Sequence, residues 1–259
     1  MSAHDLWTLI LGVGAGIASG FLNTAAAAGS AVCLPILMLI GLDPMTANAT
    51  NRIPVLVGAL SGTATFHARK ALPWALAIKV SVPSTLGSLL GAWLAGIVPG
   101  RDLGLMITAA IVIALLLLFG KLRKAVERAS AGELHYGPRE IALLFGIGVW
   151  TGFIVIDGLI YLLLTLVLLV GLPLGAANAV KAFVAIPTAI VAMAIFSYKG
   201  SIDWRIGAAA GLGSLLGGYL GARFASSPGA KQYVFYLLVT VLSAELVNLG
   251  VHYVFKTFG

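Results

Sequence analysis

The chain has 259 residues, of which 60% are hydrophobic and only 10% charged, and its net charge is +7. Soluble domains usually carry about 25% charged residues, so the composition excludes an ordinary water-exposed globular domain. The single cysteine, Cys33, excludes an internal disulfide, and no Cys/His spacing typical of a zinc site occurs. Nucleic acid is not an expected partner, because no basic stripe with interleaved aromatic residues is present.

Uncharged apolar runs indicate helices that cross a lipid bilayer. Residues 103–120 carry no charge, and about 20 such residues span the hydrocarbon core as a helix. The whole pattern predicts ten helical segments, at 6–27, 29–41, 45–66, 74–97, 103–120, 141–156, 158–171, 175–197, 204–224 and 231–255. The second, sixth and seventh are shorter than a full span, which is typical of broken or re-entrant helical hairpins. We therefore predict an all-α, multi-pass protein of the inner or plasma membrane.

The second half of the chain repeats motifs of the first half. Gly87-Ser88-Leu89-Leu90-Gly91 returns as Gly213-Ser214-Leu215-Leu216-Gly217, and Ala47-Asn48-Ala49 returns as Ala177-Asn178-Ala179. Several matches in the same order indicate a duplication. We predict a first membrane repeat over residues 1–120, a linker over 121–140 and a second membrane repeat over 141–259.

The number of segments predicts how the two repeats are oriented. Five segments in each half is an odd number, so the halves are expected to be inverted relative to each other across the membrane. With the N-terminus outside, ten basic residues in the loops fall on the cytoplasmic side and four outside. This bias agrees with the positive-inside rule, and it makes the linker at 121–140 cytoplasmic.

Stripes of small residues occur in both halves. Gly12, Gly16 and Gly20 are spaced four apart, as are Gly213, Gly217 and Gly221. On a helix each set forms a smooth face that lets membrane helices approach closely. Packing within the chain is the favoured interpretation, and the same faces would also permit a homodimer.

Glycine placement and two asparagine-containing motifs recur across the chain. The first half carries Gly12-Val13-Gly14-Ala15-Gly16, Gly29, Pro35, Gly41-Leu42-Asp43-Pro44 and Ala47-Asn48-Ala49-Thr50-Asn51-Arg52, and the second carries Gly152-Phe153, Asp157-Gly158, Gly171-Leu172 and Ala177-Asn178-Ala179-Val180-Lys181. This pattern resembles the sulfite exporter TauE/SafE family over essentially the whole chain. The resemblance implies a secondary transporter of a small anion, sulfite or an organosulfonate above all, that works by alternating access. No cofactor and no enzymatic activity are expected.

Two alternatives to this function remain open at this point. An anion channel of the same architecture would use the same cationic residues, and the substrate of a carrier could instead be a small carboxylate. A membrane-embedded enzyme is a minor alternative, because no HExxH motif, P-loop or Gly-x-Ser-x-Gly motif occurs.

Arg52 and Lys181 are the two basic residues inside apolar segments. By the repeat spacing Lys181 corresponds to Asn51, the neighbour of Arg52, so the two cations occupy nearly equivalent places. A charge buried in lipid costs at least about 2.5 kcal/mol, and a guanidinium suits the geometry of an oxyanion. We predict an anion site between the two hairpins, with Arg52 as the principal contact and Lys181 as the secondary one. The alternatives are an ion pair with Asp157 or Glu245, or snorkelling of the side chain to the interface.

Neutral polar residues complete the predicted site. Asn23 and Thr24 fall at the break of the first hairpin, where they either bind the anion beside exposed backbone N–H groups or cap the break. Asn48 and Asn178 form a repeated pair that either lines the site or hydrogen-bonds between the halves, and Asn51 lies beside Arg52.

Coupling of transport to a second ion is assigned to the second hairpin. Asp157 falls at its break, where an acid at membrane depth either binds a coupling proton, neutralises Lys181 or caps the following segment. Sodium is the other candidate for the coupling ion.

The predicted orientation can be tested by labelling from outside. Single cysteines placed in residues 125–135 are expected to stay unlabelled when sealed cells are treated with a membrane-impermeant thiol reagent, because the linker is cytoplasmic. Efficient labelling in sealed cells would reverse the orientation of the whole chain.

Overall fold

The structure is a computed structural model, and it describes residues 3–97, 134–154 and 158–227 together with positions 233 and 236. Every element in these ranges is a helix, which confirms the predicted all-α class. The helices are α1 (Ala3–Ala26), α2 (Gly29–Leu39), α3 (Pro44–Thr50), α4 (Arg52–Ala68), α5 (Trp74–Ala95), α8 (Pro138–Phe153), α9 (Gly158–Leu168), α10 (Leu174–Tyr198) and α11 (Trp204–Ala225). The predicted segments at 103–120 and 231–255 lie outside the described residues.

Helix length separates full spans from partial ones. Among the described helices, three are long and apolar enough to cross a membrane, at Asp5–Ala26, Trp74–Ala95 and Leu174–Tyr198. α2 and α9 have 11 residues each, and α8 has 16. These are the second, seventh and sixth predicted segments, so their prediction as short elements is confirmed. α8 begins at Pro138, inside the predicted linker, where the Gly137 N–H donates to the Glu140 carboxylate at 2.9 Å.

The prediction of one helix over residues 45–66 is wrong, because α3 and α4 are separated at Asn51. The physical reason is Pro54, which has no N–H to donate to the Thr50 carbonyl and whose ring crowds that carbonyl. By the spacing that relates Asn48 to Asn178, the equivalent position in the second half is Val184. Valine keeps its N–H, and α10 is continuous there.

The reversal between α1 and α2 is the break of the first hairpin. Ala27 adopts the left-handed conformation there, with φ of 62°, which costs a residue with a side chain about 1–2 kcal/mol. The turn is held by the Ala27 N–H, which donates to the Asn23 carbonyl at 3.1 Å, and by the Ala28 N–H, which donates to the Leu22 carbonyl at 3.3 Å. The surrounding bundle therefore imposes this conformation, since alanine does not prefer it.

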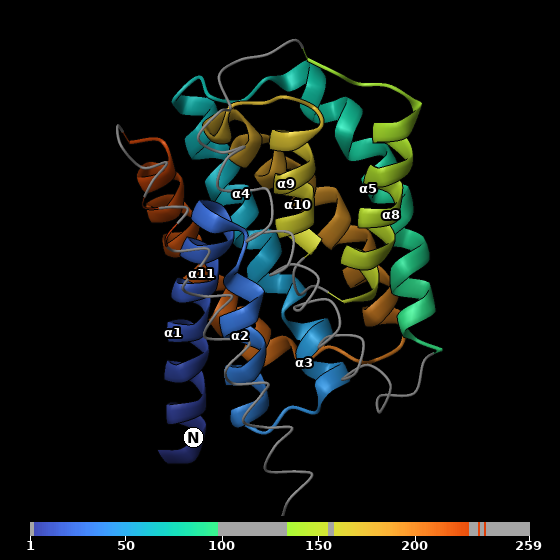
Figure 1. Cartoon of the computed structure of the whole chain (residues 1–259). Coiled ribbons are helices and arrows are strands. Elements are labelled where there is room, and N and C mark those ends of the chain that lie inside the picture. The colour runs from blue at the N-terminus through green and yellow to red at the C-terminus, as the bar shows by residue number, and fades with distance from the viewer. Residues whose placement is uncertain (1–2, 98–133, 155–157, 228–232, 234–235, 237–259) are drawn as a thin grey trace, which may run out of the picture.

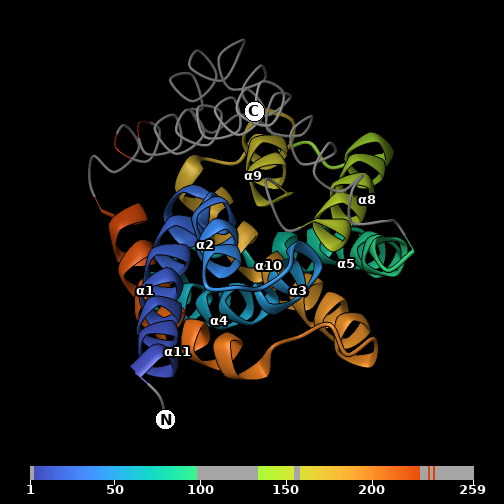
Figure 2. The same ribbon diagram turned by 90° about the horizontal axis from the view of Figure 1, so that it is seen from below.

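The two halves exchange helices in their packing. α1 packs along α11, and α5 packs along α8, so the first helix of each half lies against the last described helix of the other half. Seen along the bundle, α4 and α10 lie between these two pairs (Figure 2). This exchange is what a two-fold relation between the halves would produce. The inversion across the membrane itself stays a prediction.

Glycines make both outer pairs close. A Cβ atom built on Gly16 would lie 1.9 Å from the carbonyl oxygen of Ala210, and one built on Gly148 would lie 2.2 Å from that of Ser84. Gly213 and Gly87 face the partner backbone in the same way, at 2.0 and 2.1 Å. All four glycines serve helix packing within the chain. For Gly16 and Gly213 this confirms the interpretation of the stripes, whereas Gly87 and Gly148 lie outside the predicted stripes.

This packing generates a prediction with a matched control on one helix. Gly16→Ala should destabilise the protein by about 1–3 kcal/mol, because the new methyl group forces α1 away from α11. Gly14→Ala should be neutral or stabilising, since no atom lies within 4 Å of its Cβ position and alanine favours a helix by about 1 kcal/mol over glycine. Thermal unfolding midpoints of the purified variants measure the difference. Equal midpoints for the two variants would contradict the close approach of α1 and α11.

Candidate functional site

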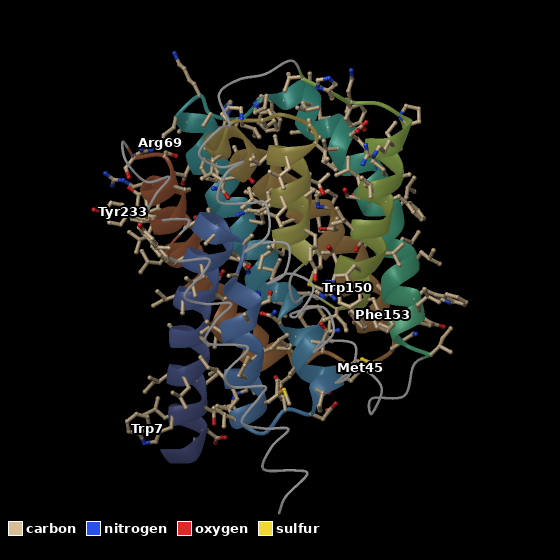
Figure 3. The ribbon with its side chains drawn as sticks, in the orientation of Figure 1. Trp7, Met45, Arg69, Trp150, Phe153 and Tyr233 are labelled. Carbon is tan, nitrogen blue, oxygen red and sulfur yellow. The ribbon has the colours of Figure 1, made fainter. Side chains whose placement is uncertain are left out.

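Two helices end inside the bundle, and the candidate site is built on those ends. Figure 3 places Trp150 and Phe153, in the last turn of α8, between the end of the molecule marked by Arg69 and the end marked by Trp7 and Met45. The last four carbonyls of a helix have no partner within it. In a membrane, where no bulk water reaches them, each unsatisfied carbonyl costs several kcal/mol. Other side chains must therefore donate to them.

The carbonyls at the end of α8 receive hydrogen bonds from the first half of the chain. The Arg52 guanidinium donates to the carbonyl oxygens of Thr151 at 2.5 Å and Gly152 at 3.0 Å. The Asn48 amide donates to the next carbonyl, that of Phe153, at 3.1 Å. We call this arrangement the α8 clamp. It joins α3 and α4 to the broken end of a helix about 100 residues later in the chain.

The end of α1 is bound by the second half in the same manner. The Lys181 ammonium donates to the carbonyl oxygens of Asn23 at 2.6 Å and Thr24 at 3.1 Å. The Asn178 amide donates to the next carbonyl, that of Ala25, at 3.3 Å. We call this arrangement the α1 clamp. In both clamps an asparagine and a cation bind three consecutive carbonyls of the other half. Asn178 and Lys181 lie on one helix, α10, whereas Asn48 and Arg52 lie on either side of the break between α3 and α4.

These contacts place the repeated asparagines. Asn48 and Asn178 both hydrogen-bond between the halves, which is one of the two roles that their repetition left open. Both side chains are buried. The sequence did not predict the carbonyl partners at Thr151, Gly152 and Ala25. Every residue has a backbone carbonyl, so the type of residue does not show which carbonyl will accept.

Both cations are enclosed by the protein, and each side chain is only 1% exposed. The snorkelling alternative is therefore wrong for both. Within the described part of the chain neither cation forms an ion pair with a carboxylate. Their partners are neutral carbonyls, the Asn178 amide oxygen and, for Arg52, the ring of Phe196, whose centroid lies 5.4 Å from the guanidinium carbon. Asp157 and Glu245 lie outside the described residues.

The two cations differ in the donors that remain. An ammonium has three N–H donors, and those of Lys181 have three acceptors, at Asn23, Thr24 and Asn178. A guanidinium has five donors, and the Nε of Arg52 is buried without a partner among the described residues. The neighbouring Asn51 is fully buried, and in the part of the chain that the structure describes neither its amide nitrogen nor its amide oxygen has a partner. Arg52 and Asn51 therefore hold the unused polar groups beside the clamps.

Asn23 and Thr24 take structural positions at the break. The Asn23 amide oxygen accepts the Gly29 N–H at 2.8 Å, which caps the start of α2, and the residue's carbonyl belongs to the α1 clamp. Thr24 contributes its carbonyl to the same clamp, while its side chain fills the notch at Gly62, where a Cβ atom would lie 2.8 Å from the Thr24 methyl. The capping role proposed for Asn23 is thus present in the structure.

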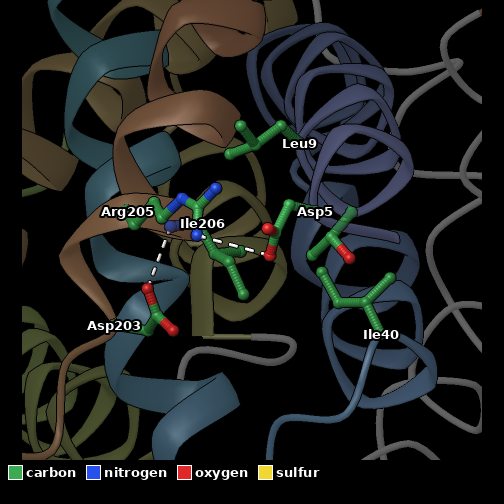
Figure 4. Close-up of a pocket in the computed structure, with 7 residues that line it drawn as sticks. Asp5, Leu9, Ile40, Asp203, Arg205 and Ile206 are labelled. Carbon is green, nitrogen blue, oxygen red and sulfur yellow. Dashed lines mark hydrogen bonds and ion pairs between the residues drawn. The ribbon is translucent and has the colours of Figure 1, made fainter. Parts of the chain in front are cut away.

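A surface pocket lies at a different place, near the start of α1. Figure 4 shows Asp5, Leu9, Ile40, Asp203, Arg205 and Ile206 around it, and Thr8 also lines it. Arg205 forms an ion pair with Asp5 at 3.5 Å, and the Asp203 carboxylate accepts the Ile206 N–H at 3.0 Å. The charge of Arg205 is already balanced, so this pocket offers an anion less than the buried cations do. No cluster of His, Cys, Asp or Glu among the described residues could hold a metal ion.

Comparisons with known proteins bear on the whole chain. The chain is 28% identical over 237 residues to the probable membrane transporter protein ORF9 of a Sinorhizobium species, covering 89% of this chain and 88% of that protein. It is 29% identical over 234 residues to the probable membrane transporter protein YfcA of Escherichia coli K12, covering 88% and 86%, and 28% identical over 237 residues to a probable membrane transporter protein of Haemophilus influenzae, covering 87% of each. No solved structure matches the chain significantly. The sequence profile of the sulfite exporter TauE/SafE family matches residues 12–246, so the chain is a membrane transporter that belongs to the sulfite exporter TauE/SafE family.

Proposed function

We propose that this transporter moves a small anion, sulfite or an organosulfonate, across the inner membrane by alternating access. The observation that carries the proposal is the pair of enclosed cations, Arg52 and Lys181, whose partners in the described structure are all neutral. Carbonyl dipoles stabilise a positive charge, but they do not cancel it. An anion entering between the clamps would supply the missing negative charge. The name of the family supports sulfite in particular.

Arg52 is the proposed principal contact. Its Nε and the Asn51 amide nitrogen are buried donors with no partner within the described ranges, and a buried donor left unpaired costs about 1–3 kcal/mol. An oxyanion that accepts from both would recover that free energy while it balances the charge. Lys181 contributes attraction through its charge, because its donors already have acceptors. Asn23, Asn48 and Asn178 belong to the two clamps, and they are proposed as the neutral polar contacts of the anion.

Alternating access requires that the two halves change their relation while the anion stays bound. The inverted repeat remains part of the proposal. So does the coupling of transport to a second ion, which is either a proton carried by Asp157 or sodium.

A flux screen in liposomes tests the substrate and the mechanism together. Sulfite, sulfoacetate, taurine, sulfate, thiosulfate and small carboxylates are presented to the purified protein, with and without a pH gradient. We expect saturable flux of sulfite or an organosulfonate and little flux of carboxylates. A voltage-driven current that does not saturate would favour the channel alternative. Selective flux of a carboxylate would show that the substrate is a carboxylate and not sulfite or an organosulfonate.

Substitution of Arg52 tests the site. Arg52→Ala should lower anion affinity roughly tenfold or more, because hydrogen bonds to charged groups contribute about 1.5–3 kcal/mol. Arg52→Lys should recover only part, since the charge returns without the planar donor fork. Anion affinity is measured on monodisperse protein by calorimetry or by the shift in thermal midpoint.

Arg223→Ala is the matched control for this substitution. Arg223 also lies 5.4 Å from a ring, that of Tyr219, but on the exposed surface. Its removal should leave affinity unchanged. If Arg52→Ala folds and binds the anion as tightly as the natural protein does, Arg52 serves only the α8 clamp. Should Arg52→Ala fail to fold, unchanged affinity in a folded Arg52→Lys would exclude the donor fork from the site.

A further inference from the structure

The proposed function uses the charge of Lys181 but does not explain why three oxygens surround its ammonium. Three oxygens converge on one point, the carbonyls of Asn23 and Thr24 and the amide oxygen of Asn178, and the Lys181 Nζ lies 2.6, 3.1 and 2.8 Å from them. We call these three oxygens the oxygen cage. All three residues are buried, so the Lys181 ammonium sits in the cage without competing bulk water.

The composition of this cage is that of a site for a small cation. Hard cations prefer oxygen ligands from carbonyls and amides. In membrane transporters, unwound carbonyls and the C-terminal ends of half-helices bind the coupling cation. The cage combines these features, because two of its oxygens belong to the last turn of α1, whose dipole is negative at that end. The third comes from α10, on the opposite half of the chain.

We infer that Lys181 is a tethered cation, and that its ammonium occupies a site which, without that side chain, binds a free monovalent cation such as sodium or ammonium. The three N–H donors of the ammonium match the three oxygens of the cage, so the tether satisfies the site completely. The role goes beyond the proposed function and does not depend on which anion is transported. It has one direct consequence, which is that the natural protein needs no sodium to join α1 to α10.

The cage also explains why the two clamps use different cations. In the α8 clamp the flat guanidinium of Arg52 spans two carbonyls and keeps a donor unused. The Lys181 ammonium is a compact point charge, so it resembles a single small cation in size and charge. The tethered-cation role therefore belongs to the α1 clamp alone.

The test measures thermal unfolding of purified protein in chloride salts of equal ionic strength, with sodium, potassium, ammonium or bulky choline as the cation. The natural protein, whose cage is already filled by Lys181, gives the baseline midpoint in each of the four salts. Lys181→Ala should unfold at a lower temperature in choline, and at least one small cation should raise its midpoint by about 2–4 °C in a saturable manner. Asn178→Ala added to Lys181→Ala should abolish that rise, because it removes a ligand from the cage.

Two variants complete the test. Lys199→Ala is the control, because the Lys199 ammonium lies 3.5 Å from the Trp93 carbonyl near the end of α5, but on the exposed surface. This variant should show no preference among the salts. Lys181→Gln should fold and should also show no preference, since its amide fills the cage without a charge.

Three outcomes would overturn the inference. One is a midpoint of Lys181→Ala that is the same in choline as in every small cation. Another is a natural protein whose midpoint rises in small cations as much as that of Lys181→Ala does. The third is Lys181→Ala protein that cannot be recovered in any of the four salts while Lys181→Gln is recovered, because the cage would then accept no free cation. Anion flux plays no part in these readouts, so failure of the proposed substrate leaves the result interpretable.

Discussion

The broken ends of α1 and α8 impose the constraint on which the rest of the structure depends. Each end leaves carbonyl oxygens inside the bundle, and a membrane protein must satisfy them internally. Both are satisfied in one way, by an asparagine and a cation from the opposite half. Each clamp therefore satisfies a helix end and joins the two halves of the chain at the same time.

This arrangement creates an electrostatic condition for function. A carbonyl oxygen only accepts hydrogen bonds, so a neutral donor is enough to satisfy it. The amides of the two asparagines are such donors. The use of Arg52 and Lys181 instead brings two positive charges into an enclosed region. A transporter of anions benefits from that choice, since the charges lower the cost of taking a small anion out of water. The clamps thus account for the architecture and supply the charge that the proposed function needs.

Close packing of the outer helix pairs makes the clamps geometrically possible. α1 and α8 are held against α11 and α5 through glycines such as Gly16 and Gly148, where backbone meets backbone. A serine on α5 and a serine on α11 each bond to a central helix of the other half. The Ser88 hydroxyl donates to the Thr188 carbonyl at 3.0 Å, and the Ser214 hydroxyl donates to the Pro54 carbonyl at 2.5 Å. With the outer pairs fixed in this way, the ends of α1 and α8 lie where α10 and α4 can reach them.

The sequence by itself determined the class of the protein, the short hairpin helices, the glycine faces and the identity of the two buried cations. These follow from composition, run length and repeated motifs, which report hydrophobicity and spacing directly. It also ranked Arg52 above Lys181, on the geometry of a guanidinium, and this ranking stays a prediction. One local feature was readable but overlooked, because Pro54 in the first turn after Asn51 predicts the break between α3 and α4.

Only the tertiary structure decided what the cations contact. The sequence predicted positive helix ends facing an anion, whereas the structure places the carbonyl ends of α1 and α8 against Arg52 and Lys181. Those acceptors are backbone atoms that every residue has, so no sequence motif identifies them. They come together through contacts about 100 to 158 residues apart in the chain. No local sequence pattern specifies how the two halves lie relative to each other. This spatial relation therefore decides which side-chain donors remain free for a substrate.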